Sequence, residues 1–175
     1  MAPLTARGHQ QATAAARLLA DERITAVYAS TALRARQTAE HLAPAVTALA
    51  ELVEMGIGAH EGSSDAAAHA LTAEVLRARI VDQGLGRRVA GGESGHEVVA
   101  RVTAAFQGIA GSHVGETVAV VGHVASLTVT LARLCSLGAR VWGTPLAHAE
   151  PFLVGWDTEA WHCRAWPGAR ASSSE

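Results

Sequence analysis

The segment from Thr117 to His123, Thr-Val-Ala-Val-Val-Gly-His, restricts the fold of this chain more than any other. The residues before its glycine are apolar or β-branched and none is charged, which predicts a strand buried on both faces of a parallel sheet. An apolar segment of helical length, from Ala125 to Leu137, follows it. His123 is therefore expected at the carboxyl end of a central strand, the edge where ligands bind in open α/β sheets.

Two interpretations of His123 remain open at this point. Many histidines close to a core are hydrogen-bonded structural residues, and this one could be among them. The functional interpretation is favoured by Gly122, because a glycine lets a ligand approach the backbone closely. It is also favoured by the helix start at Val124 to Leu127, whose free N–H groups are suited to an anion.

The composition predicts one globular domain. The chain has 175 residues, of which 49% are hydrophobic and 17% charged, enough to bury one core. Its 14 basic residues are all arginine and are nearly balanced by 16 acidic ones, so we expect neither a nucleic-acid nor a membrane partner. The absence of lysine excludes a lysine nucleophile.

The two cysteines, Cys135 and Cys163, lie far apart in sequence and form no C-x-x-C pair, so neither a disulfide nor a zinc framework is expected. The N-terminal residues lack the apolar core of a signal peptide, and no apolar segment reaches membrane-spanning length. These features predict a cytoplasmic protein.

Periodicity along the chain predicts alternating helices and strands within a single domain at 1–166, followed by a frayed tail at 167–175. Ser94 and Glu97 have the spacing of a capping box at the start of one helix. Helices are expected at 6–19, about 32–42, 65–84, from 95 to beyond 109, and 125–137; strands are expected at 24–29, 117–121, 149–155 and 161–166. The fold class that follows is a three-layer α/β domain, with a mainly parallel sheet and helices on both faces.

Two arginines, Arg34 and Arg36, lie at the start of the helix that follows the strand at 24–29. Cations near a helix N-terminus oppose its dipole, and a bound anion would reverse that preference. Either arginine could instead be solvated on an exposed face. Arg34 is the better candidate for a site, because it lies one helical turn from Ser30 and can point toward the end of the strand.

Five segments of this sequence resemble the histidine phosphatase superfamily in its phosphoglycerate mutase-like branch. In chain order they are Leu4-Thr-x-x-Gly8-x-x-Gln11-Ala12, the run from Val27 to Ala39, Leu52-x-Glu54 with Gly58 and Glu61-Gly62, Gly91-Gly-Glu-Ser94, and Val120-Val-Gly-His123. No single segment is specific to this family, but the occurrence of all five in the same order is. The resemblance implies the phosphoglycerate mutase-like fold.

The resemblance also implies roles for individual residues. In this family a histidine attacks phosphorus, arginines and a second histidine bind the phosphate oxygens, and a carboxylic acid protonates the leaving alcohol. By position, Arg34 resembles a phosphate-binding arginine, His123 the second histidine, and Glu54 the proton donor. Val124 would add an N–H group to the phosphate site. No metal or cofactor is implied. Without the motif, Glu54 would be interpreted as a solvated loop glutamate.

The family's nucleophile is found in an Arg-His-Gly motif at the end of a strand that precedes the first helix. This sequence has no such motif; Arg7-Gly8-His9 has the letters in another order, inside the first expected helix. We therefore expect His9 not to be the nucleophile and the strand beside 118–121 to be missing. An unpaired strand edge predicts self-association as a homo-oligomer. Val124 and His60 also replace the family's usual glycine and aromatic residue.

Three functions follow as hypotheses. The first is a phosphomonoester hydrolase whose nucleophile segment lies outside the given residues. The second is a pseudophosphatase, a binding module for a phosphorylated ligand or protein partner. The third, a different catalyst on the same scaffold, is favoured only by the altered loop around Glu54. In the first two, the partner is a small phosphorylated molecule or its equivalent on a protein, and the 175-residue chain itself is expected to be inactive.

Overall fold

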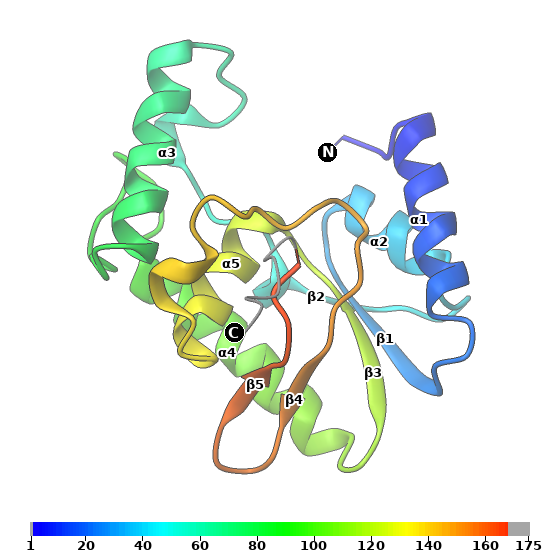
Figure 1. Cartoon of the computed structure of the whole chain (residues 1–175). Coiled ribbons are helices and arrows are strands. Elements are labelled where there is room, and N and C mark those ends of the chain that lie inside the picture. Colours follow the sequence, from blue (N-terminus) through cyan, green and yellow to red (C-terminus); the bar gives the residue numbers. More distant parts are fainter. Residues whose placement is uncertain (1, 168–175) are drawn as a thin grey trace, which may run out of the picture.

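The computed structural model describes residues 2–167, so most of the tail expected at 167–175 lies outside the described residues. The chain alternates helices with short strands (Figure 1). The helices are α1 (Ala6–Leu18), α2 (Leu33–Glu40), α3 (Ala66–Ile80), α4 (Gly95–Ser112) and α5 (Val124–Leu134). The strands are β1 (Ile24–Ser30), β2 (Thr47–Leu49), β3 (Thr117–Val121), β4 (Val154–Trp156) and β5 (Trp161–Cys163).

The main sheet has three parallel strands in the order β2-β1-β3. Tyr28 of β1 lies opposite Val120 of β3 on one side and Thr47 of β2 on the other, so β1 is the central strand. The prediction that the segment ending at His123 is a central, fully buried strand is wrong for this structure. Within residues 2–167, β3 pairs only with β1, and its residues 118–121 are half-buried because no strand covers the outer edge.

The two faces of the sheet bury different side chains, because successive residues of a strand point in opposite directions. Val27 and Ala29 pack with Ala39 of α2 on one face, whereas Tyr28 and Val120 join the larger core formed by α4, α5 and the segments after them. Figure 1 shows α1 and α2 on one side of the strands and α4 and α5 on the other. The predicted three-layer α/β fold with a parallel sheet is confirmed.

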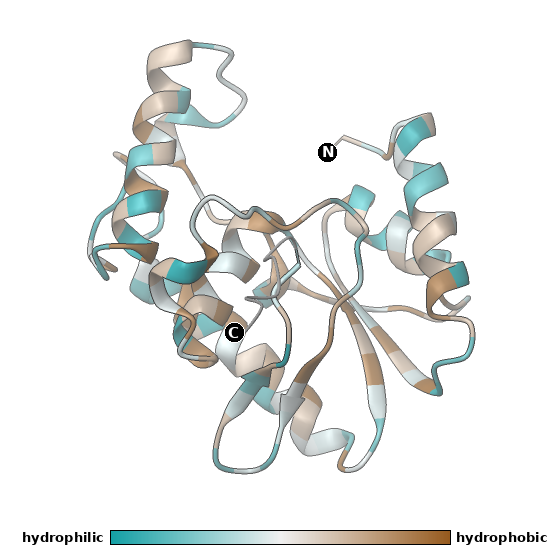
Figure 2. Ribbon diagram, viewed as in Figure 1, coloured by the Kyte–Doolittle hydropathy of each residue, from teal (hydrophilic) through white to brown (hydrophobic). Residues whose placement is uncertain are grey.

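Hydrophobic residues are frequent along the strands β1 and β3, whereas the outer helix α1 mixes hydrophilic with hydrophobic residues (Figure 2). The helix starts follow from their caps: Thr5 accepts from Gly8 N–H, Asp65 accepts from Ala67 N–H, and Ser94 forms the predicted capping box with Glu97. No helix among residues 2–167 is long and apolar enough to cross a membrane.

Several expected elements are shorter in the structure; the strand expected at 161–166, for example, ends at Cys163. The helix expected at 65–84 ends at Ile80, and the left-handed Gln83 (φ 54°) lies just beyond it. The helix expected at 125–137 ends at Leu134, two residues before Ser136 (φ 52°). The strand expected at 149–155 begins only at Val154, because Ala149 is left-handed (φ 55°) and Pro151 has no N–H to pair. Strands β4 and β5 form a separate antiparallel hairpin.

Candidate functional site

His123 lies at the carboxyl end of β3 and is the N-cap residue of α5, with only 7% of its surface exposed. Its ring is held between two groups. Arg34 Nη2 is 3.1 Å from Nδ1, and Ser30 Oγ is 2.8 Å from Nε2. A guanidinium can only donate, so Nδ1 accepts from Arg34 and the ring proton is on Nε2, which donates to Ser30. The imidazole is therefore neutral in this arrangement.

The environment of His123 explains that charge state. Burial lowers the pKa of the imidazole below its ordinary value, the charge of Arg34 lowers it further, and the negative charge of Glu54 opposes both effects. A neutral ring can accept a hydrogen bond, but it becomes a donor at both nitrogens once a proton is added. His123 can thus change from acceptor to donor when an anion replaces Arg34 at Nδ1.

Ser30 was not predicted as a site residue. It is completely buried at the end of β1, where its Oγ also accepts from Ala32 N–H at 3.2 Å. Adjacent parallel strands bring their carboxyl ends to one edge, so Ser30 and His123 meet across that edge. The signal in the sequence was its position as the last residue of a strand, four residues before Arg34.

Arg34 comes from the first turn of α2 and is exposed, yet its guanidinium reaches the buried ring of His123. Arg36, two residues later, is also exposed, and the structure gives its side chain no hydrogen-bond or ion-pair partner among the described residues. The structure thus separates Arg34, the candidate that the sequence favours, from Arg36. Only Arg34 contacts His123.

The carboxylate of Glu54 lies on the first turn of α5. Oε1 accepts from Ser126 N–H at 2.8 Å and from Met55 N–H at 2.9 Å, and Oε2 accepts from Ala125 N–H at 3.2 Å. A negative charge is favourable there, because the helix dipole places partial positive charge at its N-terminus. Glu54 is half-buried and is not the freely solvated loop residue of the alternative interpretation.

The expectation that the first turn of α5 offers several free N–H groups is therefore wrong. Glu54 takes those of Ala125 and Ser126, and Leu127 N–H bonds to the carbonyl of His123. Val124 N–H is the member of this turn with no acceptor among residues 2–167. The structure brings together His123, Arg34, Val124 and Glu54, all four of the predicted site residues, at one edge of the sheet.

The loop that carries Glu54 lies directly on the loop before α4. Ala59 N–H donates to Ala90 O at 3.1 Å, and Glu93 N–H donates to Gly56 O at 2.9 Å. The approach is so close that a Cβ on Gly58, which has a φ of 54°, would lie 2.4 Å from Ala90 O. Gly58 is thus needed for the close contact between these two backbones.

His9 and His60 lie elsewhere. His9 is exposed on α1, and its Nδ1 is 3.1 Å from His41 Nε2. His60 Nδ1 is 3.2 Å from the hydroxyl of Thr72 in α3. Within residues 2–167, no three histidine, cysteine, aspartate or glutamate side chains lie close enough to hold a metal ion.

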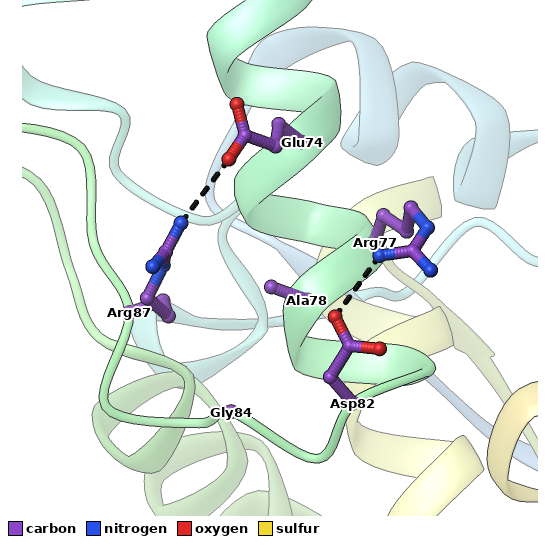
Figure 3. Close-up of a pocket in the computed structure, with 6 residues that line it drawn as sticks. All are labelled: Glu74, Arg77, Ala78, Asp82, Gly84 and Arg87. Atoms are coloured by element: carbon purple, nitrogen blue, oxygen red, sulfur yellow. Dashed lines mark hydrogen bonds and ion pairs between the residues drawn. The ribbon is translucent and has the colours of Figure 1, made fainter.

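Two hollows of the described surface do not lie at this site. One of about 280 Å³ (Figure 3) is lined by Glu74, Arg77, Ala78, Asp82, Gly84 and Arg87. Its arginines are paired with its own carboxylates at 3.0 and 3.1 Å, and these side chains are half exposed to water. A second hollow of about 270 Å³ lies between Phe152 and Trp166. Neither hollow contains His123, Arg34 or Glu54. The site is therefore identified by its residue types and their contacts and not by a hollow in the surface.

Comparison with known proteins places the chain in a family. A family model described as "Histidine phosphatase superfamily (branch 1)" matches residues 2–167. No curated protein matches the chain. Three similar solved structures are YhfR of Bacillus stearothermophilus, a mycobacterial glucosyl-3-phosphoglycerate phosphatase in its native form, and the alpha-ribazole phosphatase of Shigella flexneri.

These three structures have 24%, 22% and 24% sequence identity to the chain and TM-scores of 0.79, 0.78 and 0.73. The matches cover 97%, 96% and 99% of this chain and 86%, 89% and 87% of the other chains. At such identity the likeness concerns the fold and not the substrate.

Proposed function

The chain belongs to the histidine phosphatase superfamily, branch 1, and from this premise we propose that its Arg34–His123 site binds the phosphoryl group of a small phosphate monoester. The observation that carries the proposal is the contact of Arg34 Nη2 with His123 Nδ1, 3.1 Å long, at the sheet edge where Val124 N–H has no acceptor among the described residues. Arginine fits phosphate with two parallel hydrogen bonds, which a point charge cannot do.

Binding requires that the anion replace Arg34 as the hydrogen-bond partner of His123 Nδ1. An oxyanion placed between Arg34 and His123 takes the guanidinium donors and presents an acceptor to Nδ1. The nearby negative charge favours the protonated imidazole, so the ring gains a proton and donates to the anion. Ser30 keeps the ring in place throughout, because its hydroxyl continues to accept from Nε2–H at 2.8 Å.

The finer proposal is that residues 1–175 bind a phosphate monoester without transferring its phosphoryl group. Transfer through phosphohistidine needs a second histidine aimed at phosphorus, and the sequence holds no Arg-His-Gly motif. None of the other eight histidines has a hydrogen bond to Arg34, His123 or Glu54 among the described residues. A hydrolase therefore needs a nucleophile from further residues, and a pseudophosphatase needs none.

Binding is tested by titrating the 175-residue protein with inorganic phosphate in a calorimeter. Arg34→Gln removes a charge-assisted contact and should weaken binding about 10- to 100-fold, the equivalent of about 1.5–3 kcal/mol. Arg36→Gln is the matched control, since Arg36 is an exposed arginine on the same helix, and should change the affinity little. Equal effects of the two substitutions would refute the site.

Turnover is tested with p-nitrophenyl phosphate and a panel of sugar phosphates. The expected result is no rate above that of the His123→Ala variant. A rate of about 1 s⁻¹, at the low end of typical enzymes, that disappears in His123→Ala would show that the chain contains its own nucleophile. Phosphate binding without turnover supports the binding module for the chain as given.

A further inference from the structure

We infer that Arg101 of α4 is a positioning residue for Glu54: together with Glu93 it fixes the loop that holds the Glu54 carboxylate on the first turn of α5. The value of that placement beside the anion site rests on the proposed function, whereas the placement itself can be measured without it. Three sets of contacts support the inference.

The first set joins Arg101 to Glu93. Arg101 Nε donates to Oε1 at 2.8 Å, and Nη2 donates to Oε2 at 2.9 Å, which is the two-point arrangement that holds a guanidinium in one orientation. Only 18% of the Arg101 side chain and 28% of the Glu93 side chain are exposed. This pair is much better shielded than the other arginine–carboxylate pairs of the described chain, whose side chains are about half exposed.

The second set joins Arg101 to the backbone just before the site. Its Nη1 donates to the carbonyls of Glu51 at 2.6 Å and Val53 at 2.8 Å, and its Nη2 donates to the carbonyl of Glu54 at 3.2 Å. One guanidinium thus bonds to three carbonyls within four consecutive residues. The last of these carbonyls belongs to the residue whose carboxylate contacts α5.

The third set continues past Glu54. Glu93 Oε2 accepts from Gly56 N–H at 2.7 Å, and Glu93 N–H donates to Gly56 O at 2.9 Å. Burial raises the pKa of Glu93, but the hydrogen bonds from Arg101 and Gly56 outweigh it, and the pKa lies below the ordinary value. Glu93 is therefore ionised at neutral pH. Arg101 holds the loop before Glu54, and Glu93 holds it two residues after.

These contacts leave the backbone of Glu54 little freedom. Losing Arg101 would leave three carbonyls without their side-chain donor, and the Glu93 carboxylate would keep only the N–H of Gly56. The loop can recover part of that loss by turning its carbonyls toward water. Such a movement would withdraw the Glu54 carboxylate from the Ala125 and Ser126 N–H groups.

The test observes those two amides by NMR in the whole 175-residue protein. Glu54→Gln defines the amide resonances without the carboxylate. In Arg101→Met, both resonances should move more than half of the way to the Glu54→Gln positions. In Arg101→Lys the two resonances should move less than in Arg101→Met. Lysine keeps the positive charge but cannot form the two parallel hydrogen bonds of the guanidinium. Arg77→Met, which removes an exposed arginine paired with Asp82, is the control and should leave them in place.

A purely structural role makes a different prediction. In that case Arg101→Met lowers the melting temperature but the folded protein keeps the wild-type resonances of Ala125 and Ser126, and the inference is overturned. Should Arg101→Met not fold, Glu93→Gln gives the same comparison with the side-chain shape retained. Phosphate titration of the wild type is read separately: failure to bind would reject the proposed function and leave the positioning result standing.

Discussion

The protonation state of His123 links anion binding to pH. Its pKa is lowered in the free protein, chiefly by burial, so the ring is neutral near pH 7 and must gain a proton to donate to an anion. Between the lowered pKa of the free protein and the higher pKa of the complex, affinity should rise up to tenfold per unit fall in pH.

Sulfate is the suitable ligand for this prediction, because its own charge does not change between pH 8 and about pH 5.5, a range above the ordinary carboxyl values. Calorimetry in buffers of different ionisation enthalpy should show uptake of a proton. His123→Asn should bind more weakly and lose the pH dependence. An unchanged slope in His123→Asn would assign the proton to another group.

Glu54 places a negative charge beside the proposed anion site, on the same helix turn. Removing that charge in Glu54→Gln should strengthen the binding of inorganic phosphate at pH 8 about 3- to 30-fold, which corresponds to about 0.7–2 kcal/mol for a nearby charge in a partly solvated site. Glu51→Gln, which changes an exposed glutamate three residues away, is the control. Weaker binding in Glu54→Gln would mean that the acid contacts the ligand directly.

At the scale of elements, the loop that carries Glu54 lies directly on the loop before α4. This contact predicts that Gly→Ala substitutions at two positions differ in their effect on the free energy of unfolding. Gly58 and Gly62 both have positive φ values, 54° and 69°, but only at Gly58 would a Cβ meet other atoms. Gly62→Ala should cost only the backbone strain, about 1–2 kcal/mol. Gly58→Ala should cost about 2–5 kcal/mol, because overpacking adds to that strain.

The free energies of unfolding come from urea titrations followed by circular dichroism. Gly108→Ala is a further reference, since Gly108 lies on α4 with no atom near the added Cβ, and alanine should stabilise that helix by up to about 1 kcal/mol. Equal losses at Gly58 and Gly62 would show that the loops separate at little cost.

Elements that depend on residues close together in the sequence were predictable. The capping box of Ser94 and Glu97 depends on a spacing of three residues, and it is present in the structure. The place of β3 in the sheet was not predictable in this way, because its apolar residues show that it is covered but not which strands lie beside it. Likewise, the left-handed backbone of Ala149 and Ser136 was not predictable, because that conformation is typical of glycine and neither residue is one.

The site was predictable in part for a similar reason. His123, Arg34 and Glu54 were found through motifs, and the strand-end rule alone would have found His123. Arg101 and Glu93 were missed, because nothing in their spacing of eight residues indicates that they bond to a loop 37 to 50 residues earlier. Networks of this kind are created by packing and are visible only once helix α4 lies beside the loop.

The whole molecule should lose stability in acid in two steps. His123 has a lowered pKa, so the unfolded chain takes up its proton first, and stability falls as the pH drops below the unfolded histidine value of about 6.5. Glu93 and Glu116 also have lowered pKa values, with hydrogen bonds from Arg101 and from Thr25 among the causes. Their contribution is present above the unfolded carboxyl value of about 4.3 and is lost as the pH falls further.

Urea midpoints measured from pH 8 to pH 3 should show both steps. Glu93→Gln should be less stable than the wild type at pH 7 and should flatten the lower step, whereas His123→Asn should remove the upper one. A wild-type midpoint that stays constant from pH 7 to pH 5 would contradict the buried, neutral state of His123.

The carboxylate of Glu54 also acts at the N-terminus of α5 as an anion attached to the same chain, because it occupies N–H groups that a dissolved anion could otherwise bind. A ligand attached to the same chain acts at an effective concentration in the millimolar range even for a flexible connection, and the loop here is held by several hydrogen bonds. Dilution of the protein does not change that local concentration. The Ala125 and Ser126 amides therefore stay occupied at any protein concentration, and a dissolved phosphate that arrives at this turn of the helix meets the amide of Val124 alone.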